Sequence, residues 1–162
     1  MGLLDLEITI QASGPVPAST AWERYDRLEL WPTWSPQLRF VSTDPDPLTS
    51  VDDDNDDEDE EDEGPVRRVQ SRQRLSPGLT GRVHGPVGLW AQFTVLTLDV
   101  PAMRWSWQVR RGPLAVHLDH QVEGTADGSR TVLTLRGPAP VVLGYVPAAW
   151  YALHRLVSLS PA

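Results

Sequence analysis

The sequence contains no cysteine and no lysine. Without cysteine the chain cannot form a disulfide, supply a thiolate nucleophile or bind zinc through thiolates. Because all fourteen basic residues are arginine, Schiff-base chemistry on lysine is excluded as well. The chain also lacks an uninterrupted apolar run of about 18 residues, and its N-terminus has no basic segment followed by an apolar one. We therefore expect no membrane span, no signal peptide and a cytoplasmic location.

Motifs of assembled catalytic and metal sites are missing too. No histidine pair has metal-ligand spacing, no glycine-rich phosphate loop follows a predicted strand, and no Gly-x-Ser-x-Gly elbow is present. The faces of the predicted strands that point inward carry no carboxylate, so a mechanism with paired carboxylates is not expected. From the sequence we expect neither a cofactor nor a metal.

The net charge of −8 comes from one segment of the chain. Residues 52–63 hold eleven of the twenty-two acidic residues and no basic one. Elsewhere fourteen arginines face eleven acids, a net charge of +3. Such a body has no concentrated basic face, and we expect no nucleic-acid partner.

The acidic segment is expected to be a disordered loop insertion over residues 44–65, because dense like charges repel and bury nothing. Three interpretations remain open. It could be a solvated loop balanced by the arginines that follow it. It could be a flap that masks an arginine-rich surface or a pocket mouth. It could also collect calcium weakly, since carboxylates without fixed geometry bind that ion loosely.

Apolar residues recur at every second position between Ala91 and Arg136, which predicts three or four antiparallel strands with one buried face. The clearest case is the stretch 114–123, where His120 shares its face with the apolar residues Val116, Leu118 and Val122. An Asp-Gly pair at 127–128 marks a tight hairpin turn.

The flanking segments predict further elements. Residues 4–11 alternate as a half-buried strand, and Ser19 or Thr20 is expected to cap a short helix. A second helical turn is expected at Leu30 and Trp31, and another strand at 38–42. Residues 143–159 are expected to form a helix with a broad apolar face, which would include Trp150 and be kinked or started by Pro147.

Short motifs follow one another along the chain: Ala21-Trp22, Asp26, the Trp-Pro-x-Trp-type segment 30–36, the Pro-Gly and Gly-x-Arg segment 77–83, Phe93-Thr-Val95, Leu98-Asp99, Arg104–Trp107, His120–Glu123 and 131–135. In this order the motifs and elements resemble the START-like superfamily of helix-grip proteins, and most closely its polyketide cyclase/dehydrase group. The resemblance covers nearly the whole chain except residues 44–75, where such proteins usually cross with a short turn.

The resemblance implies a single START-like domain over residues 1–162 with an α+β fold. A curved antiparallel sheet of six or seven strands would wrap around the C-terminal helix, with two short helices after the first strand. Such proteins commonly keep a cavity between sheet and helix. Its lining is expected from inward-facing aromatic and aliphatic residues and one imidazole, namely Trp34, Phe93, Trp105, Trp107, Leu118, His120, Leu133 and Trp150. The alternative is that these aromatic side chains meet and fill the core.

His120 is the candidate for a chemical role. A histidine on the inner face could hydrogen-bond a ligand or act as a general acid or base. It could equally be a buried histidine that is satisfied by its neighbours.

Three functions follow from these observations. The first is binding of a small hydrophobic or aromatic ligand, such as a lipid, a polyketide-like or an isoprenoid molecule. The second is a cyclase or dehydratase activity with His120 as proton carrier, which the resemblance implies. The third is a protein-interaction module acting through the acidic loop. With no heptad seam in the sequence, a monomer or a weak homodimer is expected.

Overall fold

The computed structural model describes residues 4–44 and 73–158. In these residues seven strands form one antiparallel sheet in the order β1-β7-β6-β5-β4-β3-β2. The strands are β1 (Asp5–Gly14), β2 (Phe40–Thr43), β3 (Thr80–His84), β4 (Trp90–Asp99), β5 (Arg104–Arg111), β6 (Leu114–Thr125) and β7 (Gly128–Pro138). The helices are α1 (Ala18–Asp26), α2 (Trp31–Trp34) and α3 (Ala139–Ser158), with short 3-10 turns η1 (Leu28–Leu30) and η2 (Pro86–Gly88).

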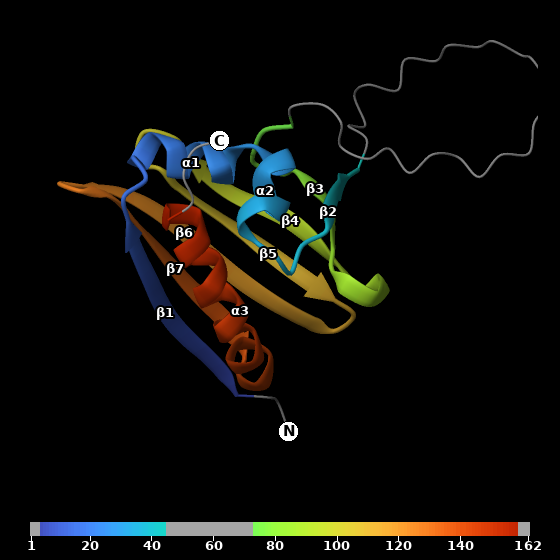
Figure 1. Ribbon diagram of the computed structural model, residues 1–162. Helices are drawn as coiled ribbons and strands as arrows, with labels where there is room; N and C mark the ends of the chain where they lie inside the picture. The colour runs from blue at the N-terminus through green and yellow to red at the C-terminus, as the bar shows by residue number, and fades with distance from the viewer. Residues whose placement is uncertain (1–3, 45–72, 159–162) are drawn as a thin grey trace, which may run out of the picture.

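This arrangement confirms the predicted α+β architecture. The sheet curves around α3, and α1 and α2 follow the first strand and cover one end of the sheet (Figure 1). Most of the acidic loop predicted over residues 44–65 lies outside the described residues.

The predicted alternation of buried and exposed residues is confirmed in the central strands. Trp105 of β5 lies opposite His120 of β6, which lies opposite Leu133 of β7, and Leu133 lies opposite Ile10 of β1. Because side chains at paired positions project from the same face, these four residues form one row across the inner face of the sheet.

A β-bulge interrupts the ladder between β4 and β5. The register shifts between Val95 and Thr97, and the extra residue, Leu96, is exposed. A bulge bends its strand and increases the local twist. It therefore adds to the curvature that makes the inner face concave.

Helix α1 begins earlier than predicted. Its N-cap is Pro17, whose side chain makes no capping bond, and so the expected cap at Ser19 or Thr20 is wrong. The carbonyl of Pro17 already accepts hydrogen bonds from the backbone N–H groups of Thr20 and Ala21, each over 3.0 Å. The fixed φ of proline suits this position, which makes a side-chain cap one turn later unnecessary.

Helix α3 also begins before its predicted start at residue 143, and it contains Pro147 in its interior. Its buried stripe faces the sheet and consists of Val142, Ala149, Ala152, Leu153, Leu156 and Val157. Trp150 is 51% exposed, so its expected place on the buried face is wrong. Trp150 lies at the edge of the stripe, where the sheet no longer covers the helix.

The C-terminal end of α3 is held by the segment around α1. The backbone N–H of Val16 donates to the carbonyl of Val157 over 3.1 Å. The buried guanidinium of Arg24 donates to the carbonyl of Leu156, and burial lowers the pKa of this arginine. A cation here also interacts favourably with the negative end of the helix dipole.

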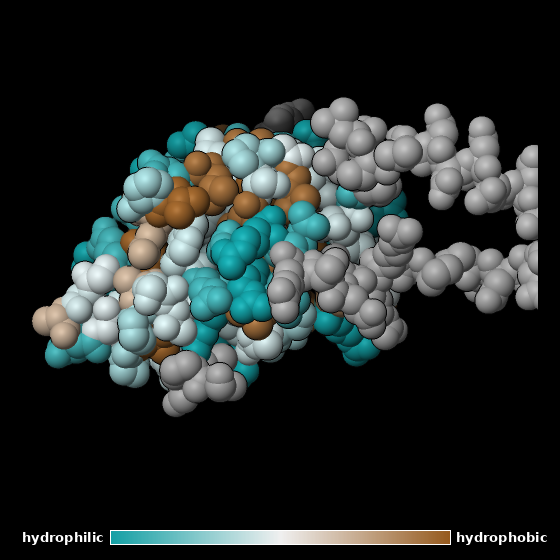
Figure 2. Space-filling model, turned by 90° about the horizontal axis from the view of Figure 1, so that it is seen from above, coloured by the Kyte–Doolittle hydropathy of each residue, from teal (hydrophilic) through white to brown (hydrophobic). Residues whose placement is uncertain are grey.

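No helix in the part of the chain that the structure describes combines the length and apolar character that crossing a bilayer requires. Seen from the end where α1 and α2 lie, hydrophobic residues form patches that hydrophilic residues interrupt (Figure 2).

Candidate functional site: an apolar cavity under helix α3

A cavity of about 540 Å³ lies between the concave face of the sheet, α2 and α3. Its wall is almost entirely apolar and includes aromatic and aliphatic side chains from all three: Trp31, Trp34, Trp105, Trp107, Val109, Val116, Leu118, Leu133, Val141, Ala149 and Leu153. The volume falls within the range of pockets that hold drug-sized ligands, roughly 300 to 1,000 Å³.

Six of the eight residues that the sequence placed in the lining are in this wall: Trp34, Trp105, Trp107, Leu118, His120 and Leu133. Phe93 and Trp150 are not, and their expected positions are corrected. Phe93 is 2% exposed and packs edge-on against Trp107, with ring centroids 5.6 Å apart. It fills the core behind the wall, as the alternative interpretation of the aromatic residues proposed. Trp150 lies outside and packs on the ring of His154 at 3.9 Å.

The sequence did not indicate several residues of the wall, among them Trp31, Gln37, Arg111 and Tyr145. Tyr145 could have been found from helical spacing, because it lies one turn before Ala149 on α3. Its hydroxyl oxygen accepts a hydrogen bond from the Gln37 amide over 3.3 Å. Gln37 belongs to a loop, where no periodic pattern marks the direction of a side chain.

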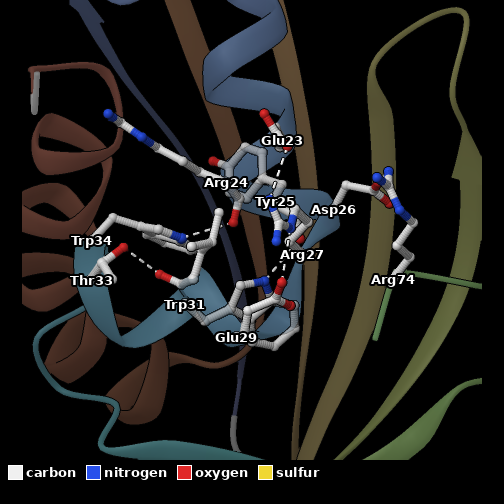
Figure 3. Close-up of polar contacts among 11 residues, drawn as sticks. Glu23, Arg24, Tyr25, Asp26, Arg27, Glu29, Trp31, Thr33, Trp34 and Arg74 are labelled. Carbon is white, nitrogen blue, oxygen red and sulfur yellow. Dashed lines mark hydrogen bonds and ion pairs between the residues drawn. The ribbon is translucent and has the colours of Figure 1, made fainter. Parts of the chain in front are cut away.

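Two tryptophans are held in the wall by the end of α1. The indole N–H of Trp31 donates to the carbonyl of Tyr25 over 2.8 Å, and that of Trp34 to the carbonyl of Arg24 over 2.9 Å (Figure 3). These carbonyls belong to the last turn of α1 and would otherwise lack helical partners. The bonds fix both indole rings and join α1 to α2.

The next segment of the chain is tied to the same place. Asp26, at the end of α1, forms an ion pair with Arg74, and the two charged groups are 2.5 Å apart (Figure 3). The backbone N–H of Leu75 donates to the carbonyl of Asp26 over 2.9 Å, and that of Leu28 to the carbonyl of Gln73 over 3.1 Å. The chain therefore returns from the segment outside the described residues directly onto the end of α1.

The aromatic part of the wall is one continuous cluster. Trp31 contacts Trp107 edge-on at 5.1 Å and stacks on Trp105 at 5.7 Å, and Trp105 stacks on His120 at 4.5 Å with ring planes 7° apart. Such contacts add to the stabilisation from burial and hold each ring in place. The wall is therefore preorganised.

His120 uses both ring nitrogens for hydrogen bonds. Trp107 donates its indole N–H to Nε2 over 3.1 Å. An indole can only donate, so Nε2 is the acceptor and the proton of the neutral imidazole lies on Nδ1. Nδ1–H then donates to the hydroxyl oxygen of Tyr25 over 3.3 Å, and the hydroxyls of Tyr25 and Thr131 are hydrogen-bonded to each other over 2.7 Å.

Burial determines the protonation of this chain of groups. It lowers the pKa of His120 to about 3 and raises the pKa of Tyr25. Near neutral pH both are uncharged, as a low-dielectric interior requires of groups without a charged partner. His120 is thus a satisfied, neutral core residue, which was one of the two interpretations that the sequence left open.

The other histidines lie away from the cavity wall. The His84 Nε2 lies 3.0 Å from the Ser42 hydroxyl, and its ring stacks on Phe40 at 4.1 Å. The pKa of His84 is lowered by partial burial and by the charge of Arg82. His117 lies on the outer face of the sheet, beside the ion pair of Arg104 with Asp119.

The cavity opens at the end of the sheet opposite α1. Leu89, Trp90 and Leu114 line it and are 50%, 39% and 39% exposed. Leu89 follows η2, Trp90 begins β4, and Leu114 begins β6 after the hairpin from β5. In Figure 1 these segments lie at the lower end of the sheet, next to the start of α3. These three residues form the mouth of the cavity.

Within residues 4–44 and 73–158, no three histidine or carboxylate side chains come together as a metal would require. What the geometry offers is shape and burial. An apolar, largely rigid wall can accommodate an apolar molecule, and polar groups at its edge can orient such a molecule.

No protein-family model and no curated protein matches the chain. Solved structures do. Ara h 8.0201 has 13% sequence identity and a TM-score of 0.60, over 94% of this chain and 97% of that one. An uncharacterized protein from Rhizobium leguminosarum has 13% identity and a TM-score of 0.62, over 96% and 93%.

Major latex-like protein 151 from Panax ginseng has 8% identity and a TM-score of 0.63, over 98% of this chain and 100% of that one. At such identities the similarity concerns the fold. In each case it extends over nearly the whole of both chains. The protein therefore shares the fold of these structures, which confirms the predicted helix-grip arrangement of a curved antiparallel sheet around a C-terminal helix.

Proposed function

We propose that this protein binds a small hydrophobic ligand in the cavity between the sheet and α3. The observation that carries the proposal is the cavity itself, about 540 Å³ in volume and walled by tryptophans and aliphatic residues. Protein interiors are normally packed to the density of organic crystals, and an unfilled cavity costs stability. A cavity of this size is therefore best explained by a molecule that fills it.

The wall defines the class of ligand. Trp31, Trp105 and Trp107 form an aromatic part of the wall that is fixed by ring contacts, and Leu118 and Leu133 continue the apolar wall along the sheet. Rigid aromatic walls bind a ligand without a large loss of side-chain entropy. Lipids, polyketide-like compounds and isoprenoids all have the apolar surface that such a wall would bury.

A cyclase or dehydratase is the alternative that the sequence suggested. It would need His120 as proton carrier, yet both ring nitrogens are bonded within the protein and the pKa is about 3. An efficient general acid or base has a pKa near the operating pH. These observations favour binding over catalysis through His120. The third hypothesis, interaction through the acidic loop, concerns residues outside the described part of the chain and stays a prediction.

The test is to fill the cavity. Ala149 lines it from the buried face of α3, and its neighbour Ala148 does not. We expect Ala149→Leu to weaken binding of an apolar fluorescent probe by about tenfold, because each buried methylene that the ligand loses is worth roughly 0.8 kcal/mol. Ala148→Leu serves as the matched control and should bind like the wild type.

Val109→Phe, which fills the cavity from the sheet, provides a second variant in case Ala149→Leu disturbs α3. Native mass spectrometry of the protein from its own host complements the titration, because a retained apolar compound would be released on denaturation. If the wild type shows no saturable binding, or if both filling variants bind like the wild type, the proposed site is wrong.

A further inference from the structure

Arg111 is the one charged residue in the wall of the cavity as the described residues define it, and that wall contains no carboxylate. Arg111 is the last residue of β5 and lies opposite Leu114, the first residue of β6. It follows Trp105, Trp107 and Val109 at steps of two residues, which places it on the inner face of the sheet. Its guanidinium is therefore at the mouth and not in the depth of the cavity.

Within the described residues Arg111 makes no ion pair and no side-chain hydrogen bond. Five other arginines behave differently, since Arg27, Arg74, Arg104, Arg130 and Arg136 each bond a glutamate or an aspartate. A guanidinium presents five N–H donors in a planar fork that fits an anionic oxygen pair. Arg111 thus offers an unused anion-binding group next to apolar surface.

The surroundings of Arg111 are those of an entrance for an amphiphile. Leu89, Trp90 and Leu114 are partly exposed at the mouth and line the cavity, and the aromatic wall begins further in. A molecule whose apolar part lies along Trp107 and Leu118 would leave its other end at the mouth. An anionic head group there would remain near water, and would so avoid most of the cost of burying a charge.

We propose that the ligand is an amphiphile with an anionic head group, which Arg111 binds at the mouth while the apolar part fills the cavity. The inference rests on the proposed binding function and adds the chemical class of the ligand to it. A carboxylate and a phosphate monoester share the required chemistry. The interior of the cavity supplies no charged partner for a ligand, because His120 is neutral and both its ring nitrogens are hydrogen-bonded within the protein. Only the mouth can therefore select a ligand by its charge.

The experiment compares three ligands with the same ten-carbon chain: decanoate, decyl phosphate and decan-1-ol. Binding is measured by titration calorimetry at low ionic strength and below the concentrations at which they form micelles. We expect both anions to bind the wild type about fivefold or more tightly than the alcohol, a factor appropriate to a solvent-accessible ion pair. If only one anion shows this advantage, the head group is of that kind.

Arg111→Gln should remove the advantage of the anions and leave the affinity for decan-1-ol unchanged. Arg110→Gln is the matched control, because Arg110 is the neighbouring residue on the opposite face of β5 and should leave all three affinities unchanged. Sodium chloride at 0.5 M should reduce the advantage in the wild type but not alter binding of the alcohol, because salt screens exposed charges.

Two results would overturn the proposal in different ways. If Arg111→Gln binds the anions as tightly as the wild type, or if Arg110→Gln weakens them equally, Arg111 does not recognise the head group. Binding of decan-1-ol would then still uphold the cavity as a ligand site. If none of the three compounds binds saturably, the binding function is wrong and the inference about its ligand falls with it.

Discussion

The indole N–H of Trp107 donates to Nε2 of His120 over 3.1 Å, within the wall of the cavity. Because the indole N–H can only donate a hydrogen bond, Nε2 must accept, and the one proton of the neutral imidazole lies on Nδ1. This N–H then points to the hydroxyl of Tyr25. The tryptophan thereby turns a histidine on an apolar face into a neutral structural residue. The bond links β5 to β6, and the Tyr25 hydroxyl continues the link to α1.

The first prediction concerns the pH dependence of stability. The folded protein keeps His120 unprotonated down to a pKa of about 3, whereas the unfolded chain takes up that proton near pH 6.5. The contribution of His120 is therefore fully present above pH 6.5 and is lost as the pH falls from 6.5 towards 3. The free energy of unfolding should fall by about 1.4 kcal/mol per pH unit through this group.

Urea unfolding of the wild type and of His120→Gln between pH 7 and pH 4 measures this contribution as the difference in slope. Equal slopes of unfolding free energy against pH for the wild type and His120→Gln would contradict the prediction, because they would mean that folding does not lower the pKa of His120.

The second prediction compares two tryptophans of the wall. Trp107→Phe removes the donor to His120 and leaves a buried acceptor without a partner, whereas the Trp105 indole N–H has no partner among the described residues. Both changes remove a similar ring area. We expect Trp107→Phe to lower the free energy of unfolding by about 1 to 2 kcal/mol more than Trp105→Phe. Equal losses in chemical denaturation would contradict the role of the bond.

The third prediction concerns two glycines. A Cβ at Gly14 would lie 2.3 Å from the carbonyl oxygen of Val157, where backbone meets backbone and neither can yield easily. Gly14→Ala should therefore destabilise the protein by more than about 2 kcal/mol. At Gly144, inside α3, a Cβ meets nothing within 4 Å, and Gly144→Ala should stabilise the protein by roughly 0.5 to 1 kcal/mol. Thermal unfolding of the two variants should shift in opposite directions.

The fourth prediction concerns the ion pair that anchors Arg74 to the end of α1. The Asp26 side chain is 11% exposed, whereas both partners of the pair between Glu7 and Arg136 are at least 50% exposed. Water screens the second pair more strongly. Double-mutant cycles with Asp26→Asn and Arg74→Gln should give a coupling of about 1 kcal/mol, against less than about 0.5 kcal/mol for Glu7→Gln and Arg136→Gln. If the coupling between Asp26 and Arg74 were no larger than that between Glu7 and Arg136, Arg74 would not anchor its segment to the end of α1.

The strands of the sheet were predictable because side chains alternate between two faces with a period of two. That period is a local property of the chain, and it placed Trp105, Trp107, Leu118 and His120 on the inner face without any knowledge of their neighbours. The helices were less predictable at their ends. Pro17 starts α1 through its carbonyl and its fixed φ, and no side-chain cap marks that position.

Trp150 shows where a helical pattern fails. The apolar face of α3 is broader than the stripe that the curved sheet covers, so a residue at its edge remains exposed. Phe93 shows the corresponding limit for a strand. Its inward direction was correct, but Trp31 and Trp107 lie over it and separate it from the cavity.

The alternation of side chains and the order of the elements were enough to predict the fold class, the inward direction of His120 and the apolar character of the surface around it. The remaining features of the site depend on how the elements pack against one another. Whether facing aromatic residues fill a core or line a cavity depends on the distance between α3 and the sheet, which no local pattern encodes. Whether His120 is reactive or inert depends on Trp107 and Tyr25, which folding brings to its two nitrogens from another strand and from a helix.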